Sequence, residues 1–194
     1  MNRQHDLLKK IKDGEARIGI IGLGYVGLPL ALRFHDEGFR VLGFDVDPRK
    51  IQLLAAGKGY IKHIPAARVA ALPKSGRFAA TTDFRRLKEA DAVVICVPTP
   101  LDANKQPDMS FIEVTSDMVA RNLRAGQLVS LESTTYPGTT RELLLPKFEK
   151  TGLKVGRDFF LVFSPEREDP GNPKFHTQNT PKVVGGITPA CRTL

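Results

Sequence analysis

The chain has 194 residues, of which 41% are hydrophobic and 26% are charged. This composition is typical of one soluble globular domain, and it excludes a disordered chain and a collagen-like or low-complexity protein. The net charge of +8 suits nucleic acid, a membrane surface or a small anionic ligand as partner. Because the positive residues are scattered, and the densest runs at 9–12 and 85–88 read as solvated helix faces, we do not expect nucleic acid as a partner.

Residues 1–16 form a charged N-terminal segment that lacks the apolar centre of a signal peptide. The apolar runs of the chain are all far shorter than the ~18 residues of a membrane span, so no membrane association is expected. Cys96 and Cys191 form no CxxC motif and no disulfide framework, which favours a reducing cytoplasm. The histidines lack the spacing of metal ligands, so we expect no metal site and place His35 and His63 at the surface.

Short apolar runs alternate along the chain with longer amphipathic stretches. The runs are mostly continuous, as expected for strands buried on both faces, and they lie at 17–21, 41–44, 78–80, 92–97, 128–131 and 159–163. Helices are predicted between them at 26–37, 48–56, 84–88, 109–123 and 139–150. This alternation predicts an α/β fold with one doubly wound parallel sheet, the Rossmann architecture, as a single domain over residues 17–194. We expect the strand order 3-2-1-4-5-6.

Three details refine this reading. Asp108 or Ser110 is suited to cap the helix predicted at 109–123. Residues 57–76 are long for a connection and are predicted to hold a short helix around 66–72. After a polar stretch that ends near 181, the chain reaches Leu194 without a predicted packed element, which is typical of a truncated chain.

Gly22, Gly24 and Gly27 form a G-x-G-x-x-G pattern between the first predicted strand and the helix that follows it. The pattern alone is weak, but this context is the one that dinucleotide binding needs. Gly22 would make the tight turn, Gly24 would let a pyrophosphate approach the backbone, and Gly27 would let the helix pack on the strand. The free N–H groups at the helix N-terminus would face the pyrophosphate. A glycine-rich turn without a ligand is the alternative.

Asp45 lies 21 residues after Gly24, at the end of the second predicted strand. A carboxylate at this place accepts hydrogen bonds from the ribose hydroxyls of the adenosine moiety. Because it also repels a 2′-phosphate, it favours NAD over NADP as cofactor. Arg49 and Lys50 lie close enough in sequence to leave NADP open.

Two further loops follow the fourth and fifth predicted strands. Thr99 lies in a Pro-Thr-Pro loop beside the point where the strand order reverses, which is where ligands bind in open α/β sheets. A proline-rich strand end is the alternative. The fifth strand is followed by the sequence ESTTYPGTT at 132–140, whose hydroxyls could cap the next helix. Capping explains Thr139 or Thr140 better than it explains Thr134.

Five segments taken together resemble the UDP-glucose/GDP-mannose dehydrogenase family of nucleotide-sugar 6-dehydrogenases. They read IGIIGLGYVGLPLAL, GFDVDPRKI, ADAVVICVPTP, ESTTYPGTT and FSPEREDPGN, in this order from about Arg17 onward. The resemblance implies oxidation of the C6 alcohol of a UDP-sugar to a carboxylate in two NAD-dependent hydride transfers. It also implies a cytoplasmic enzyme of surface-polysaccharide synthesis that forms a homo-oligomer.

The resemblance assigns roles to particular residues. The cofactor-binding positions would be Gly22, Gly24, Tyr25, Val26 and Gly27 at the pyrophosphate, Asp45 and Lys50 at the ribose, and Thr99 on the adenine-ribose side. Thr134 would lie by the cofactor and position a catalytic water near the reacting carbon. Glu166 would act as the acid-base group in hydrolysis of a thioester intermediate, and a loop carboxylate paired with Arg167 is the alternative.

The chain also departs from the family pattern. The family's nucleophilic cysteine lies in a glycine-rich segment that has no counterpart here, and we expect Cys96 and Cys191 to be inert. The family's catalytic lysine and asparagine and its sugar-binding domain are missing as well. The resemblance therefore implies the N-terminal NAD-binding domain of a longer enzyme, a fragment that can be monomeric and that binds NAD without catalysis. A non-catalytic nucleotide-binding module is the rival interpretation.

Residues 165–172 bear on the sugar. UDP-glucose and GDP-mannose enzymes tend to read PEFLRE there, whereas this chain reads PEREDPGN. This sequence resembles that of the branch that acts on UDP-N-acetylhexosamines, such as UDP-N-acetylglucosamine 6-dehydrogenase. UDP-glucose and UDP-N-acetylmannosamine remain alternative substrates. His176, in the same loop, could contact the ligand.

Overall fold

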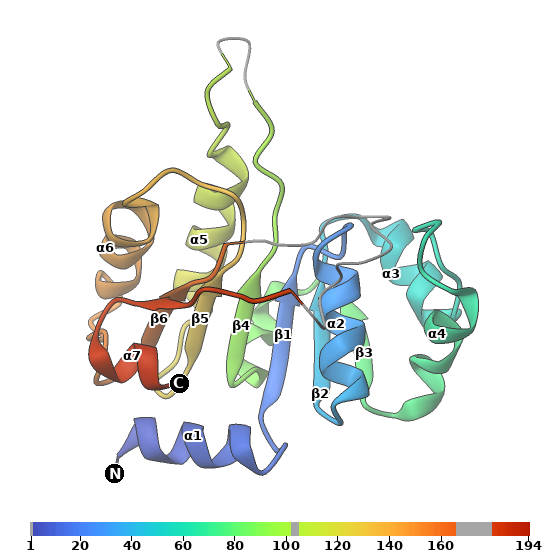
Figure 1. Cartoon of the computed structure of the whole chain (residues 1–194), viewed down its shortest axis with the longest axis horizontal. Helices are drawn as coiled ribbons and strands as arrows, with labels where there is room; N and C mark the ends of the chain where they lie inside the picture. The colour runs from blue at the N-terminus through green and yellow to red at the C-terminus, as the bar shows by residue number, and fades with distance from the viewer. Residues whose placement is uncertain (1, 102–104, 166–179) are drawn as a thin grey trace.

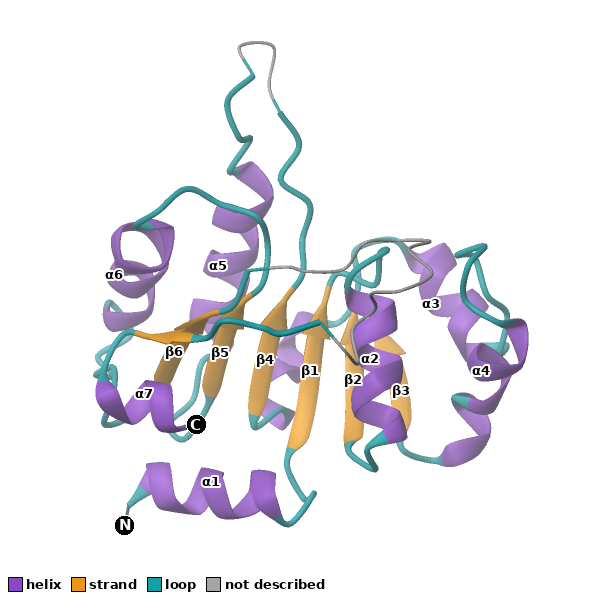
Figure 2. Cartoon of the chain, in the orientation of Figure 1, coloured by secondary structure: helices purple, strands orange, loops and turns teal. Residues whose placement is uncertain are grey.

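The computed structural model describes residues 2–101, 105–165 and 180–194. Within these residues, strands form one sheet in the order β3-β2-β1-β4-β5-β6-β7 (Figures 1 and 2). The bounds are β1 (Arg17–Ile21), β2 (Arg40–Phe44), β3 (Phe78–Thr81), β4 (Ala92–Ile95), β5 (Leu128–Leu131), β6 (Phe160–Phe163) and β7 (Gly185–Gly186). Strands β1 to β6 are parallel, and β7 pairs antiparallel with β6 at the edge. The predicted order is confirmed, with β7 added to it.

The continuous apolar runs are explained by two cores on opposite faces of the sheet. Because successive side chains of a strand point to opposite faces, each run supplies both cores. On one face, Ile20 and Val94 pack with Leu28 of helix α2 (Gly27–Asp36). On the other face, Val93 and Val129 pack with Ile112 of helix α5 (Ser110–Asn122).

The helices between α2 and β6, other than α5, lie close to their predicted ranges, except the short η1, which was not predicted. They are α3 (Pro48–Ala55), α4 (Ala66–Ala71), η1 (Pro73–Ser75), η2 (Phe84–Glu89), η3 (Thr140–Leu144) and α6 (Leu145–Glu149). Helix α4 confirms the short helix expected in the connection 57–76. The predicted helix 139–150 begins with a wide π-helical turn before α6, in which the Leu145 N–H bonds to the Thr140 carbonyl. Pro146 follows directly and lacks the N–H that would continue the regular α-helical pattern.

A pair of extended arms joins β4 to α5 and projects beyond the carboxyl ends of the strands (Figure 1). The arms are joined by an isolated antiparallel β-bridge between Leu101 and Pro107 and by a hydrogen bond of 2.7 Å from the Asp108 N–H to the Pro100 carbonyl. The Asp108 side chain then accepts from the Ser110 N–H at 2.9 Å. Of the two expected caps of α5, Asp108 is therefore the one that satisfies a free N–H of the first turn.

Helix α1 (Arg3–Lys12) crosses the amino ends of the strands (Figure 2). Its Leu7 is buried against the sheet, with an exposed fraction of 2%. Arg3 bonds to Asp158 at 2.9 Å, and Lys10 bonds to Asp91 at the same distance. The charged N-terminal segment is thus attached to the rest of the fold by Leu7, by the partly buried Ile11 and by these two ion pairs.

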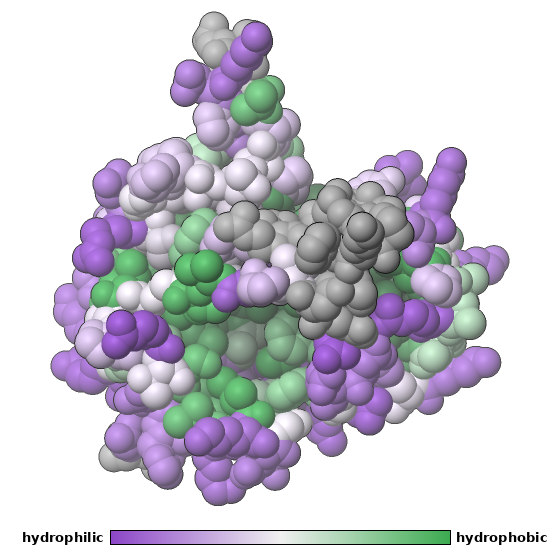
Figure 3. Space-filling model, in the orientation of Figure 1, coloured by the Kyte–Doolittle hydropathy of each residue, from purple (hydrophilic) through white to green (hydrophobic). Residues whose placement is uncertain are grey.

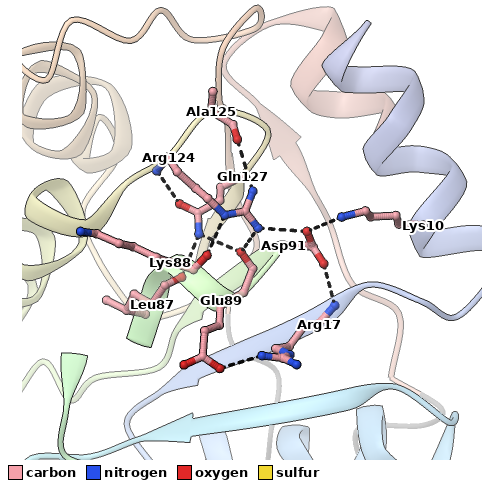
Figure 4. A network of polar contacts seen from close by, with 10 residues as sticks. Lys10, Arg17, Leu87, Lys88, Glu89, Asp91, Arg124, Ala125 and Gln127 are labelled. Atoms are coloured by element: carbon pink, nitrogen blue, oxygen red, sulfur yellow. Dashed lines mark hydrogen bonds and ion pairs between the residues drawn. The ribbon is translucent and has the colours of Figure 1, made fainter. Parts of the chain in front are cut away.

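Asp91 is the centre of a polar network at this end of the sheet (Figure 4). Its buried carboxylate accepts from Lys10 Nζ at 2.9 Å, from Arg124 Nη2 at 3.0 Å and from the Arg17 N–H at 3.0 Å. Burial by itself raises the pKa of Asp91, but these three donors outweigh it and hold the pKa below its usual value. The buried Gln127 side chain donates to the Leu87 and Ala90 carbonyls, so the neighbouring backbone is satisfied too.

Two expectations about packing are wrong. The chain does not end without a packed element, because α7 (Pro189–Thr193) folds back against β6 after the β7 pairing. Its Cys191 is fully buried, and the Cys191 sulfur accepts from the Leu161 N–H at 3.3 Å. In Figure 3 apolar residues gather on this face, beside α7 and above the polar residues of α1.

His35 is the second correction, because its exposed fraction is only 8%. It follows Leu28, Ala31 and Leu32 at the helical spacing, so α2 places its imidazole on the same buried face. His63, in contrast, is exposed as expected.

Candidate functional site

A cavity of about 740 Å³ opens at the carboxyl ends of β1, β2, β4 and β5, where the strand order reverses between β1 and β4. Residues from four separate strand ends meet there. Among the sequence-predicted residues, the cavity is lined by Gly22, Gly24, Tyr25, Val26, Asp45, Lys50, Thr99 and Thr134. Gly27 lies just behind this wall, in the first turn of α2.

The three glycines of the turn differ in what surrounds them. Gly22 has a φ of +90°, and a Cβ added to it would lie 2.5 Å from the Cys96 carbonyl oxygen. A Cβ on Gly27 would lie 1.8 Å from the Gly22 carbonyl oxygen. A Cβ on Gly24 would meet nothing within 4 Å. Gly22 and Gly27 are therefore required by packing, whereas Gly24 leaves open space beside the cavity for an approaching ligand.

The Asp45 carboxylate joins the end of β2 to this turn. It is 5% exposed, and its Oδ2 accepts from the Leu23 N–H at 2.9 Å and from Lys50 Nζ at 2.8 Å. Its Oδ1 accepts from the Asp47 N–H at 3.0 Å. A carboxylate has about four acceptor positions, so about one remains for a hydroxyl group in the cavity.

The two cations near Asp45 both have carboxylate partners. Lys50 is bonded to Asp45 itself, and Arg49 makes a two-point contact with Asp47, with distances of 3.0 Å from Nε and 2.9 Å from Nη2. The Arg49 contact holds the pKa of Asp47 below its ordinary value. Each cation therefore already donates to a carboxylate and is not reserved for a 2′-phosphate, so the site matches NAD better than NADP.

The loops after β4 and β5 are bonded to each other on the far side of the cavity. The Thr99 hydroxyl donates to the Thr134 carbonyl at 2.7 Å, and the Ser133 hydroxyl donates to the Val97 carbonyl at 2.7 Å. The buried Thr139 hydroxyl instead donates to the Tyr136 carbonyl at 2.8 Å and caps no helix. Thr134 is thus held in the cavity wall, while Thr139 is a residue of the loop interior.

Sequence reasoning missed several residues of the cavity. Phe111 and Val114 of α5 line it with exposed fractions of 46% and 59%, although the buried face of that helix is formed by Ile112 and Val119. Apolar side chains outside the buried face of an amphipathic helix are a signal that could have indicated them.

Glu132 is a further missed residue. It lines the cavity at the end of β5, is 8% exposed and forms an ion pair with Lys182. The two residues are far apart in sequence, so no local pattern indicates their contact. Glu166, Arg167, the rest of the segment 165–172 after Pro165, and His176 lie outside the described residues.

The described part of the chain holds no cluster of three or more His, Cys, Asp or Glu side chains that could bind a metal ion. None of the helices seen there is long and apolar enough to cross a membrane. Cys96 confirms its expected burial with an exposed fraction of 8%, and it packs among the apolar residues of β1 and α2.

Comparison with known proteins identifies close similarity along nearly all of the chain. The model of the UDP-glucose/GDP-mannose dehydrogenase family, NAD binding domain, matches residues 16–194. The UDP-N-acetyl-D-glucosamine 6-dehydrogenase of Pseudomonas aeruginosa is 36% identical over 181 residues, which cover 93% of this chain and 42% of that protein. The UDP-N-acetyl-D-mannosamine dehydrogenase of Pyrococcus horikoshii is 33% identical over 179 residues, with 92% and 43% covered.

A solved structure agrees with this similarity. The NDP-N-acetyl-D-galactosaminuronic acid dehydrogenase from Methanosarcina mazei Go1 has a TM-score of 0.86 at 35% identity, covering 100% of this chain and 43% of that one. The chain therefore spans less than half the length of each of these three relatives.

Proposed function

The chain belongs to the UDP-glucose/GDP-mannose dehydrogenase family, and from this premise we propose that its cavity binds NAD as the cofactor half of a nucleotide-sugar 6-dehydrogenase. One observation carries the proposal. A single cavity is lined by the glycine-rich turn after β1, Asp45 after β2, Thr99 after β4 and Thr134 after β5. This is the place where open α/β sheets bind dinucleotides.

Different residues of the cavity would contact different parts of NAD. The open space at Gly24 admits the pyrophosphate to the N-terminal end of α2, with Tyr25 and Val26 beside it. The free acceptor position of Asp45 takes a ribose hydroxyl, and Lys50 holds that carboxylate in place. Thr99 lines the adenine-ribose side.

Bound NAD would accept the hydride that leaves C6 of the sugar. Thr134 lines this cavity, and its hydroxyl would orient the attacking water near that carbon. Glu166 would take the proton from this water as general base. Both roles rest on the positions of these residues in the family's motifs.

For the substrate we propose UDP-N-acetylglucosamine, with oxidation to the corresponding uronic acid for surface polysaccharide in the cytoplasm. The sequence of residues 165–172 and the similarity to the Pseudomonas aeruginosa enzyme support this choice. The relative of similar identity from Pyrococcus horikoshii is a UDP-N-acetyl-D-mannosamine dehydrogenase, so that sugar is the main alternative. The whole enzyme would be a homo-oligomer, whereas these 194 residues alone would be a monomer.

These 194 residues should bind NAD without oxidising any sugar. The family reaction passes through a thioester on a cysteine, and this chain has two cysteines only. Cys191, in α7, is fully buried, and Cys96 is 8% exposed within an apolar cluster. Neither thiol has the exposure that a nucleophile needs.

Calorimetric titration of the purified chain with NAD tests the proposal, with Gly24→Val as the variant. Because nothing lies within 4 Å of a Cβ at Gly24, we expect the variant to keep its melting temperature and to lose NAD affinity at least tenfold. NADH formation with UDP-N-acetylglucosamine, UDP-N-acetylmannosamine and UDP-glucose should be undetectable. The absence of NAD binding by the parent chain, or equal binding by the variant, would refute the proposed site.

A further inference from the structure

The connection between α3 and α4 lies against the glycine-rich turn and contacts it twice. The Tyr60 hydroxyl donates to the Leu23 carbonyl at 2.6 Å. The rings of Tyr25 and His63 are stacked, with centroids 5.8 Å apart and an angle of 26° between their planes. Ile61, which is 4% exposed, fixes the connection to the apolar core from the other side.

The Tyr60 contact restrains the peptide group between Leu23 and Gly24, whereas Asp45 restrains the preceding one, between Gly22 and Leu23. The Leu23 N–H is bonded to Asp45 at 2.9 Å, while the Leu23 carbonyl is bonded to Tyr60. In a planar trans peptide, the carbonyl and the next N–H point in opposite directions. A fixed Leu23 carbonyl therefore fixes the direction of the Gly24 N–H, which points away from Tyr60.

The Gly24 N–H is a donor for which the described part of the chain offers no acceptor. Among residues 2–101, 105–165 and 180–194, it donates to no acceptor, although the Gly24 carbonyl is already bonded to the Leu28 N–H at 3.1 Å. Gly24 lines the cavity and has open space beside its Cα. Such an N–H is suited to an anionic oxygen.

We propose that Tyr60 is a positioning residue for the dinucleotide, which directs the Gly24 N–H toward the pyrophosphate, and that His63 supports the same turn by stacking on Tyr25. This inference rests on the proposed function, since it assumes that NAD binds in this cavity. Tyr60 acts through the peptide group of Leu23 and touches no reacting atom.

The environment of Tyr60 keeps its hydroxyl a donor. Burial raises the pKa of Tyr60, and the nearby negative charges of Asp45 and Asp47 raise it further. The phenol therefore stays protonated over the whole range in which the protein would be assayed.

The main test is Tyr60→Phe, which removes one oxygen atom and leaves the ring in the core. We expect the affinity for NAD and ADP-ribose to fall about three- to tenfold, the range for one lost hydrogen bond. Adenosine carries no pyrophosphate, so its affinity should not change. Merely structural damage would instead weaken all three ligands and lower the melting temperature.

Tyr136→Phe is the matched control. Tyr136 is 43% exposed, does not line the cavity, and its hydroxyl makes no hydrogen bond within the described residues. For His63, the alanine variant should weaken NAD binding about two- to threefold, while His63→Phe, which can still stack on Tyr25, should restore it.

Hydrogen exchange of the ligand-free protein tests whether Tyr60 restrains the turn, independently of whether the cavity binds NAD. In Tyr60→Phe, the amides of residues 22–26 should exchange faster than in the parent chain, whereas those of β4 should not change. Failure of the parent chain to bind NAD would refute the proposed function alone, because the exchange data still decide whether Tyr60 restrains the turn. Unchanged exchange, or equal loss of adenosine and NAD affinity, would overturn the role of Tyr60.

Discussion

Replacement of Asp45 by asparagine should change the preference between NAD and NADP. The carboxylate is 5% exposed and accepts from the Leu23 N–H, the Asp47 N–H and Lys50 Nζ. Asparagine has nearly the same shape and retains one acceptor oxygen for the turn. It removes the negative charge that would face a 2′-phosphate, and it frees Lys50 from its partner.

The magnitude follows from the charges. Two unit charges about 4 Å apart interact by about 1 kcal/mol in water and by about 4 kcal/mol at an effective dielectric constant near 20. A phosphate monoester carries about −1.5 to −2 at pH 7, so loss of the Asp45 charge should favour NADP by at least about 1.5 kcal/mol. NAD should lose about 1 kcal/mol, because a charged acceptor of the ribose hydroxyl becomes a neutral one. The ratio of NADP to NAD affinity should therefore rise by about fifty-fold or more.

Calorimetric titration of Asp45→Asn with both dinucleotides measures this ratio, and Asp83→Asn is the control. Asp83 follows β3 as Asp45 follows β2, and its carboxylate accepts from the N–H and side chain of Arg85. The Arg85 contact lowers the pKa of Asp83 to about 2, so Asp83 is a charged carboxylate, but it does not line the cavity. An unchanged ratio in Asp45→Asn, or an equal change in Asp83→Asn, would show that Asp45 does not face the ribose.

Three other variants test the fold around the site. Gly27→Ala should fail to fold to the parent structure, because its Cβ would lie 1.8 Å from the Gly22 carbonyl oxygen, and a thermal melt equal to that of the parent would contradict this. Asp91→Asn should lower the melting temperature at pH 7 by about 3–12 °C, the range for losing about 1.5–3 kcal/mol in a domain of this size. The pKa of Asp91 is lowered on folding, so its contribution is complete above the unfolded value of about 3.9 and is lost as the pH falls through the lower folded value. The difference between parent and Asp91→Asn should consequently shrink below about pH 4, and a constant difference down to pH 2 would disprove the assignment. Cys191→Ala should lower the melting temperature by a few degrees, because it leaves the Leu161 N–H without its acceptor. Its NAD affinity should not change, because Cys191 lies far from the cavity. Weaker NAD binding, measured at a temperature where the variant is fully folded, would show that Cys191 does affect the cavity.

The sheet could be predicted from the sequence because burial on both faces leaves an unambiguous signal. Strands β1 and β5 have their predicted bounds, and the order of β1 to β6 follows from right-handed crossovers. The final part of the chain could not be read in this way. The pairing of β7 with β6 involves two glycines, which have no side-chain pattern, and α7 has only five residues. A histidine is a residue type common at the surface, whereas the position of His35 on the face of Leu28, Ala31 and Leu32 gives the burial that the structure shows.

The site was predictable only where the fold fixes the spacing. The turn after β1 and Asp45 after β2 belong to one βαβ unit, and parallel strands bring their carboxyl ends to the same edge. Tyr60 is 37 positions from Leu23, and Lys182 is 50 positions from Glu132. Such contacts depend on how a long connection packs, and a single sequence carries no periodic signal for them.

Stability and binding are assigned to opposite ends of the same sheet. At the amino ends, the Asp91 carboxylate has three donors and the Gln127 amide two carbonyl acceptors, so that network leaves little for a ligand to bond. At the carboxyl ends, Asp45 and Tyr60 use their hydrogen bonds to hold the two peptide groups on either side of Leu23, and the neighbouring Gly24 N–H donates to no acceptor within the described residues. Because the strands are only four or five residues long in this region, both ends share one rigid core. A ligand can therefore use donors whose orientation was already fixed on folding, and the entropy of ordering the turn is not a cost of binding.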